Sequence, residues 1–314
     1  MISKKFFNPI FFIPSAIFLM TLCFGLSGAI ANDSQPVCPD LCGNNSQFTS
    51  EFRLQDCKYF KSVGKNTYFN LIPGFKSTFE SEDEAAEITV LWDREWIDLR
   101  SQGLGWVKTR VVEERAYEKN EDEELLLTEI SFNWIAICKK TNAVYYFGED
   151  SNDCSLERGG FDPDDETKCL FPELEDSEEI GLLAVEEEDE DLDPDTAGSW
   201  RAGVDGARPG LLMPGTFLLG AKYFQELAPK GEEDVDDSAC DRGQNEAMGL
   251  TADNPRGDKF TDCVEVADTN PVEGECAVVG ENADIKIYCP GVGLVSDGDL
   301  ELTEYGYDRL WHDH

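Results

Sequence analysis

The hydrophobic positions of this chain fall into short runs separated by turns, and several runs alternate with polar positions. The run EITVLWDREWIDL (87–99) is rich in β-branched and aromatic residues, and 123–150 contains two such runs around the turn KKTN. These lengths and compositions are typical of strands, which we prefer to the alternative of a helix over 113–130. The pattern predicts a mainly β fold of antiparallel curved sheets or a half-barrel.

The same texture returns after Gly198. We expect a strand or hairpin over 217–228 and an alternating strand over 259–269. The segment 283–306 reads as two strands around a Pro-Gly turn, followed by the tight turn DGDL and a last strand. The inward-facing candidates of 259–269 are Phe260, Cys263 or Val264, and Val266.

Two pairs of segments resemble each other across the chain. NLIPGFKSTFE (70–80) and LLMPGTFLLGAKYFQE (211–226) share an apolar Pro-Gly entry that leads into an aromatic strand. Residues 131–148 and 284–298 each read as a pair of strands with aromatic residues. This correspondence predicts two tandem similar halves.

The N-terminus has the order of a secretory signal peptide. Two lysines at positions 4 and 5 precede an apolar run that ends in Ala29-Ile30-Ala31, so we expect cleavage after Ala31. An N-terminal membrane anchor is the alternative, and lipidation at Cys23 is disfavoured because a leucine precedes it. We therefore expect a secreted, periplasmic or cell-surface protein without a membrane span after signal cleavage.

These patterns together predict six segments. They are the signal peptide (1–31), a cysteine-containing lead-in (32–65), the first β half (66–148), an acidic low-complexity insertion (149–197), the second β half (198–306) and a tail (307–314).

The charge of the chain restricts its partners. Aspartate and glutamate number 65 against 26 lysines and arginines, which gives a formal net charge of −39. Nucleic acids and anionic membranes are polyanions, so they are poor partners for such a surface. We predict no nucleic-acid partner.

The acidic insertion contains a calcium candidate. Asp162, Asp164, Asp165 and Glu166 cluster there, and calcium prefers carboxylate oxygens. The spacing and the central glycine of an EF-hand loop are missing, so we prefer a solvated acidic loop. Calcium remains the one possible cofactor.

Cysteine usage agrees with export. Ten cysteines remain after the expected cleavage, and disulfides are the default in an exported chain. A zinc site at Cys38 and Cys42 is the less favoured alternative, because no second close pair accompanies them. Histidine occurs only at His312 and His314, so a Ser-His-Asp or Cys-His site would need the tail to fold back.

The stretch AGSWRAGVDGARPGLLMPG (197–215) is unusual after the acidic insertion. Its ligand-binding candidates are Trp200, Arg201, Asp205 and Arg208, because arginine binds carboxylates with planar donors. We prefer a structural interpretation, in which this segment is an ordered crossover with Asp205 as the nearest partner of the arginines. The alternative is a ligand loop on the rim of a β-sheet cavity.

A second candidate is Glu95 between Trp92 and Trp96, an arrangement that resembles a sugar site. On a strand the two tryptophans share one face and Glu95 takes the other. We therefore prefer tryptophans packed in the core and a solvent-facing Glu95.

Several long motifs carry a resemblance to a known family. FRLQDCKYFKSVGKNTYFNLIPGFKSTFE, NWIAICKKTNAVYYFGED, GSWRAGVDGARPGLLMPGTFLLGAKYFQE, FTDCVEV and IYCPGVGLVSDGDLELTEYG resemble an uncharacterised family of secreted bacterial β-rich proteins, over most of 52–306. The layout is loosely similar to LolA-like half-barrels. The chain departs from the family in its acidic insertion and in Cys289, where alanine is usual, and we expect Cys276 as the partner of Cys289.

The resemblance brings no activity, so function rests on the residues. We favour a non-enzymatic binding protein for a small apolar or amphipathic ligand or a surface partner. A cavity lined by aromatic residues near Trp134, Tyr145, Phe224 and Tyr288 would support it. The alternatives are an acidic cell-surface or matrix structural protein that binds calcium weakly, and a carboxylate-based hydrolase.

Overall fold

The computed structural model describes seven ranges of the chain: 45–120, 125–153, 199–229, 240–241, 244–251, 260–269 and 284–307. All of them belong to one compact unit, Gln35–His314. The predicted signal peptide, Cys38 and Cys42, the calcium candidates and the two histidines lie outside the described residues.

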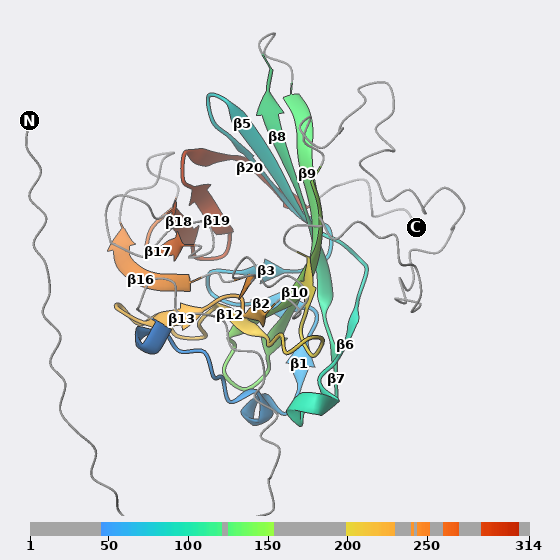
Figure 1. Cartoon of the computed structure of the whole chain (residues 1–314). Coiled ribbons are helices and arrows are strands. Elements are labelled where there is room, and N and C mark those ends of the chain that lie inside the picture. Colours follow the sequence, from blue (N-terminus) through green and yellow to red (C-terminus); the bar gives the residue numbers. More distant parts are fainter. Residues whose placement is uncertain are drawn as a thin grey trace, which may run out of the picture. The chain divides into compact units, whose positions relative to one another are not determined.

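Fourteen strands form one large antiparallel sheet (Figure 1). They are β1 (Phe60–Lys61), β4 (Phe75–Glu80), β5 (Glu84–Val90), β8 (Arg110–Lys119), β9 (Leu125–Cys138), β10 (Val144–Asp153), β11 (Trp200–Arg201), β12 (Gly210–Met213), β13 (Lys222–Phe224), β16 (Gln244–Thr251), β17 (Cys263–Thr269), β18 (Asp284–Cys289), β19 (Gly293–Asp297) and β20 (Leu300–Tyr307).

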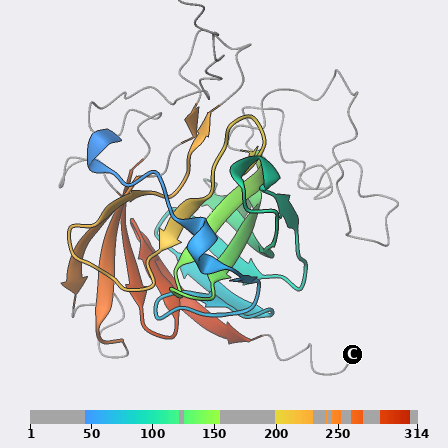
Figure 2. The same cartoon turned by 90° about the horizontal axis from the view of Figure 1, so that it is seen from below.

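The order in the sheet is β11-β10-β9-β8-β5-β4-β20-β19-β18-β17-β16-β13, with β1 beside β9 and β12 beside β10. The pairing of β4 with the C-terminal β20 joins the two parts of the chain. Because β11 and β13 end this order, the described sheet is an open, curved half-barrel, as predicted. Figure 2 shows the two parts of the sheet, on either side of the β4–β20 pair, curving toward each other. We call these parts the two arms of the sheet.

Smaller elements surround the sheet. The short two-stranded sheets pair β2 (Gly64–Lys65) with β3 (Asn70–Leu71), β6 (Trp96–Asp98) with β7 (Trp106–Lys108), and β14 (Ala228–Pro229) with β15 (Cys240–Asp241). The described helices are short 3-10 turns, η1 (Asn45–Gln47), η2 (Leu54–Cys57) and η3 (Arg100–Gln102). In the part of the chain that is described, no helix is long and apolar enough to cross a membrane.

Alternation of side chains gives the sheet one inner face. On β4, Phe75, Ser77 and Phe79 are buried while the residues between them are more exposed, which is the period of two expected of a half-buried strand. Register shifts in several ladders, such as those after Ala116 and after Leu302, are the bulges that bend a sheet. The curvature turns this inner face into the wall of a concave space.

Most of the predicted strands are confirmed. β9 and β10 flank the turn KKTN, and β8 with β9 replaces the alternative helix over 113–130. β18, β19 and β20 occupy 283–306 as expected, and Phe260, Cys263, Val264 and Val266 are all buried. The segment 217–228 holds less regular structure than expected, because β13 covers only Lys222–Phe224. The duplication of the two halves stays a prediction.

The run 87–99 is interrupted, and a buried arginine explains why. Arg110 has no exposed surface, and its guanidinium donates hydrogen bonds to backbone carbonyls of Ser62 (2.9 Å), Leu91 (3.3 Å), Trp92 (2.5 Å) and Asp93 (3.1 Å). A buried cation without acceptors is costly, so the backbone after β5 turns its carbonyls toward it. The strand therefore stops at Val90.

Two disulfides link described residues, Cys57–Cys138 and Cys263–Cys289. The first ties η2 to β9 across 81 residues of sequence, and all four cysteines are buried. The expected pairing of Cys289 with Cys276 is wrong. β17 and β18 are neighbouring strands in which Val264 faces Tyr288, and this register brings Cys263 opposite Cys289, with 4.2 Å between their Cα atoms.

Candidate functional site

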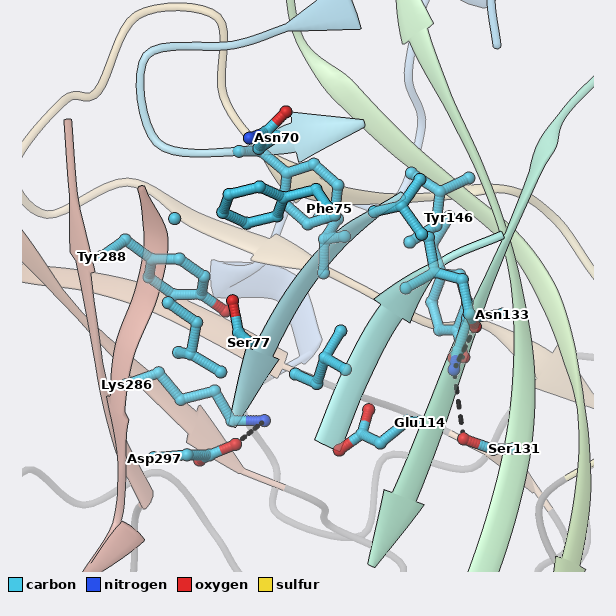
Figure 3. Close-up of a pocket in the computed structure, with 18 of the residues that line it drawn as sticks. Asn70, Phe75, Ser77, Glu114, Ser131, Asn133, Tyr146, Lys286, Tyr288 and Asp297 are labelled. Carbon is cyan, nitrogen blue, oxygen red and sulfur yellow. Dashed lines mark hydrogen bonds and ion pairs between the residues drawn. The ribbon is translucent and has the colours of Figure 1, made fainter. Parts of the chain in front are cut away.

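The concave face of the sheet encloses a cavity of about 290 Å³ (Figure 3). Its volume lies at the lower end of the range typical of small-molecule sites. It is lined by Phe69, Asn70, Phe75, Ser77, Phe79, Ile88, Val90, Val112, Glu114, Glu129, Ser131, Asn133, Ile135, Tyr146, Glu149, Leu212, Gln225, Glu226, Lys286, Tyr288, Val292, Gly293, Leu294 and Asp297. The lining joins residues from both arms of the sheet.

One part of the lining is apolar. Phe75 and Phe79 come from β4, and Ile88, which pairs with Ser77 between them, comes with Val90 from the adjacent strand β5. Ser77 sits between the two phenylalanines on the same face of β4 and is buried. This wall offers an apolar body a place to be buried, which is the main source of affinity in such sites.

The other part of the lining is ionic. The ammonium group of Lys286 lies 3.0 Å from Asp268 and 3.3 Å from Asp297, on the strands to either side of β18. Burial alone would lower the pKa of Lys286, but these two carboxylates outweigh burial and raise that pKa well above its usual value. Lys286 is therefore a permanently protonated group near neutral pH and has no lone pair for nucleophilic chemistry.

Glu114 is the exceptional carboxylate of the cavity. It pairs with Ile88 on one side and Ser131 on the other, and Figure 3 shows its carboxylate turned into the cavity. Burial raises its pKa to about 7; Lys286 opposes this shift, while Asp297 and Glu129 add to it. It makes no hydrogen bond or ion pair with any other described residue, so none of them pairs directly with its carboxylate.

Neutral hydrogen-bonding groups complete the polar part. The Tyr146 hydroxyl donates to Oδ1 of Asn133, whose amide donates to Ser131 Oγ (3.1 Å) and to the Val112 carbonyl (3.3 Å). Burial, followed by Glu149 and Glu226, raises the pKa of Tyr146 well above its usual value. This tyrosine therefore remains a neutral donor and fixes the orientation of Asn133.

The four candidates of the 197–215 segment do not line this cavity. Arg201 donates from Nη1 and Nη2 to Glu95 Oε1, both at 3.1 Å, and its guanidinium stacks 4.4 Å from the ring centroid of Trp134. The expected pairing of the arginines with Asp205 is wrong: no described ion pair joins them. The reason is that β11 pairs with β10 and thereby carries Arg201 toward Glu95 and Trp134.

Close backbone packing holds this segment. Trp200 is buried and meets Tyr146 edge to face at 5.2 Å between ring centroids. The amide of Ala202 donates to Phe147 O at 2.9 Å, and Gly148 leaves no room for a Cβ because the Trp200 carbonyl lies against it. These contacts fit the structural interpretation of the segment, while a ligand role for its residues stays untested.

The preferred interpretation of the tryptophans around Glu95 is wrong. Trp92 and Trp96 are 59% and 50% exposed, and Glu95 is half-buried against Arg201. The alternation assumed for this run holds, but its inner face is the other one, because Ile97 and Leu99 are the buried residues and Glu95 shares their phase. Of the aromatic residues expected around a cavity, Tyr288 lines it, and Trp134, Tyr145 and Phe224 do not.

Sequence reasoning missed Glu114 and Lys286. Each is a charged residue at an inward position of its strand, in phase with Val112 on β8 and with Tyr288 on β18. This alternation with buried neighbours could have revealed them in the sequence, because a charged side chain on the buried face of a strand needs a partner or a function. Among the described residues, no group of three or more His, Cys, Asp or Glu side chains is arranged to hold a metal ion.

Comparison with family models, with curated proteins and with solved structures finds no match to this chain. The resemblance to secreted bacterial proteins and the LolA-like layout therefore stay predictions. What the site can do has to be argued from its geometry.

Replacing Arg201 by lysine is expected to lower the free energy of unfolding by about 1 kcal/mol, because lysine cannot reproduce both the paired donors and the stacking on Trp134. The measurement is urea unfolding followed by tryptophan fluorescence. Arg208→Lys is the matched control, since no described ion pair involves Arg208, and we expect it to stay within about 0.5 kcal/mol of the parent. Equal effects of the two changes would contradict a stabilising role for the contacts of Arg201 with Glu95 and Trp134.

Proposed function

We propose that this protein is an exported, non-enzymatic binding protein that holds a small amphipathic molecule in the cavity of its half-barrel. The observation that carries the proposal is the division of the lining into an apolar wall, which includes Phe75 and Phe79, and an ionic end around Glu114 and Lys286. A core that served only for stability would gain from filling this space, since voids and buried charges both cost free energy. The disulfides and the expected signal peptide support export.

A carboxylate-based hydrolase is the second candidate, favoured by one observation. Glu114 has a pKa of about 7 and lies in electrostatic contact with Glu129 and Asp297, which resembles the division of labour between an acid and a base. Sustained product release from a panel of chromogenic glycosides and esters, lost in Glu114→Gln, would favour it over binding. We prefer binding because the apolar wall accounts for half of the lining without invoking a reaction.

Replacing Ser77 by phenylalanine tests the cavity. Ser77 is 7% exposed and lies between Phe75 and Phe79 on the inner face, so the new ring fills the cavity. We expect at least a roughly tenfold loss of affinity, about 1.4 kcal/mol, for an apolar fluorescent probe or a co-purifying ligand. Fluorescence titration and native mass spectrometry measure this loss.

Thr78→Phe is the matched control, because the neighbouring position on β4 faces away from the cavity. It adds the same ring to the opposite face and should leave binding unchanged. Binding that survives Ser77→Phe at full affinity would place the ligand elsewhere and overturn the proposal.

A further inference from the structure

We infer that the ligand of this cavity carries a cationic group, such as a protonated amine, which Glu114 binds while the apolar wall takes the rest of the molecule. This inference rests on the proposed binding function and names the chemical class of the ligand. It follows from three observations: the charges of the lining, the ion pairs that Lys286 already makes with Asp268 and Asp297, and the position of Glu114.

The lining is strongly unbalanced in charge. Among the described residues, its acidic members are Glu114, Glu129, Glu149, Glu226 and Asp297, and its basic member is Lys286. Glu114, Lys286 and Tyr288 are buried groups of this lining, and charges interact more strongly at buried positions than at the surface. A ligand with an anionic head, such as a carboxylate or a phosphate, would enter a region of negative potential.

Lys286 does not relieve this imbalance. Its ammonium group is already held by Asp268 at 3.0 Å and Asp297 at 3.3 Å, so one positive charge faces two negative ones. An anionic ligand would have to displace one of these carboxylates to reach it. Among the described lining residues, no cation is therefore available to an anionic head.

Glu114 completes the argument. Its carboxylate points into the cavity and has no hydrogen bond or ion pair with another described residue (Figure 3). The charged and titratable groups around it are Lys286 from β18, Asp297 from β19, Glu129 from β9, Tyr146 from β10 and Tyr288 from β18. Two of these are carboxylates, the tyrosines are neutral, and Lys286 acts on Glu114 without forming an ion pair with it, because it is paired with Asp268 and Asp297. A cation from outside would be the direct partner that Glu114 lacks among the described residues.

The protonation of Glu114 couples binding to pH. With a pKa of about 7 the empty site holds a partly protonated carboxyl group near neutrality, and a bound cation lowers that pKa by favouring the ionised form. Binding of a permanently protonated amine should therefore strengthen as the pH rises from about 5.5 to 8 and release a proton near pH 7.

Three probes with one apolar chain and different heads test the class: n-octylamine, 1-octanol and octanoate, titrated by isothermal calorimetry into the full exported chain. At pH 8 we expect octylamine to bind at least roughly tenfold more tightly than octanol, and octanoate to bind most weakly. At pH 5.5 the preference for the amine should shrink, because Glu114 is then protonated.

The variant Glu114→Gln distinguishes the contribution of the carboxylate to binding from that of the rest of the cavity. We expect this variant to bind octylamine no more tightly than octanol, to keep the parent affinity for octanol, and to have a melting temperature at pH 8 at least as high as the parent. Glu118→Gln is the matched control, since Glu118 is an exposed glutamate of the same strand outside the lining, and it should keep the preference for the amine.

Each outcome decides between the two proposals. Octanol and octanoate binding as tightly as octylamine would overturn the cationic class and leave the binding function standing. Failure of all three probes, together with native mass spectra free of any co-purifying molecule, would overturn the binding function itself. A preference for octylamine that persists in Glu114→Gln would assign the cation to another carboxylate and overturn the role of Glu114.

Discussion

Replacing Cys57 and Cys138 together by alanine is expected to lower the free energy of unfolding by at least about 4.5 kcal/mol. The disulfide closes a loop of 81 residues, and in the chain-entropy model a loop of this length stabilises the folded state by about 4.5 kcal/mol. Both cysteines are buried, so the substitutions also leave small voids. Urea unfolding of the double variant measures the loss.

The second disulfide provides a matched control. Cys263 and Cys289 are separated by only 26 residues, for which the same model gives about 3.5 kcal/mol. The Cys263→Ala/Cys289→Ala variant should therefore be the more stable of the two double variants. The reverse order would mean that strain or residual structure in the unfolded chain, rather than loop length, determines the contribution of these disulfides.

The strands were predictable because their signal is local. Alternation in FKSTFE and the turn KKTN belong to neighbouring residues, and the strands form where these patterns occur. The half-barrel follows from many such strands with aromatic inner faces. The pairing of β4 with β20 is different, since it joins residues more than 200 positions apart, and nothing in either segment alone specifies its partner.

The errors share this physical cause. Cys289 bonds Cys263 because of the register between β17 and β18, and Arg201 finds Glu95 because β11 lies against β10. Trp92 and Trp96 are exposed because Ile97 and Leu99, in the opposite phase of the same run, pack in the core against residues of other segments. In each case a contact between distant segments outweighed the local pattern.

The sequence allowed a cavity with aromatic lining to be predicted, but it did not allow most of the lining residues to be predicted. Aromatic strands around a concave face made a cavity reasonable, and Tyr288 was correctly placed in it. The ionic end depends on β8, β18 and β19 meeting across the sheet, where Glu114, Lys286 and Asp297 come together. Their charges were three among the many of this acidic chain, so composition could not single them out.

Replacing Lys286 by methionine is the change with the sharpest consequences for this ionic end. It keeps most of the side-chain volume and leaves Asp268 and Asp297 without their cation. Removing one partner of a buried ion pair costs about 3–5 kcal/mol, and we expect about 3 kcal/mol at pH 8, because 23% of the Lys286 side chain is still accessible. Urea unfolding at pH 8 measures this cost.

The pH dependence of this variant has a definite sign. The pKa of Lys286 is raised in the folded parent, so its contribution is complete below the pKa of an unfolded lysine, about 10.4, and is lost only as the pH rises through the folded value. In Lys286→Met the uncompensated carboxylates take up protons in the folded state. The stability gap to the parent should therefore narrow between pH 8 and pH 5.

Two further variants test this account. Asp268→Asn and Asp297→Asn, added to Lys286→Met, remove the uncompensated charges and should recover most of the lost stability at pH 8. In Lys286→Met the pKa of Glu114 should rise above its parent value of about 7, because Lys286 holds it down, and the added Asp297→Asn should reverse part of that rise, because Asp297 raises it. A gap that stays constant from pH 8 to pH 5, with no recovery in the triple variant, would mean that Lys286 stabilises the fold by packing rather than by charge.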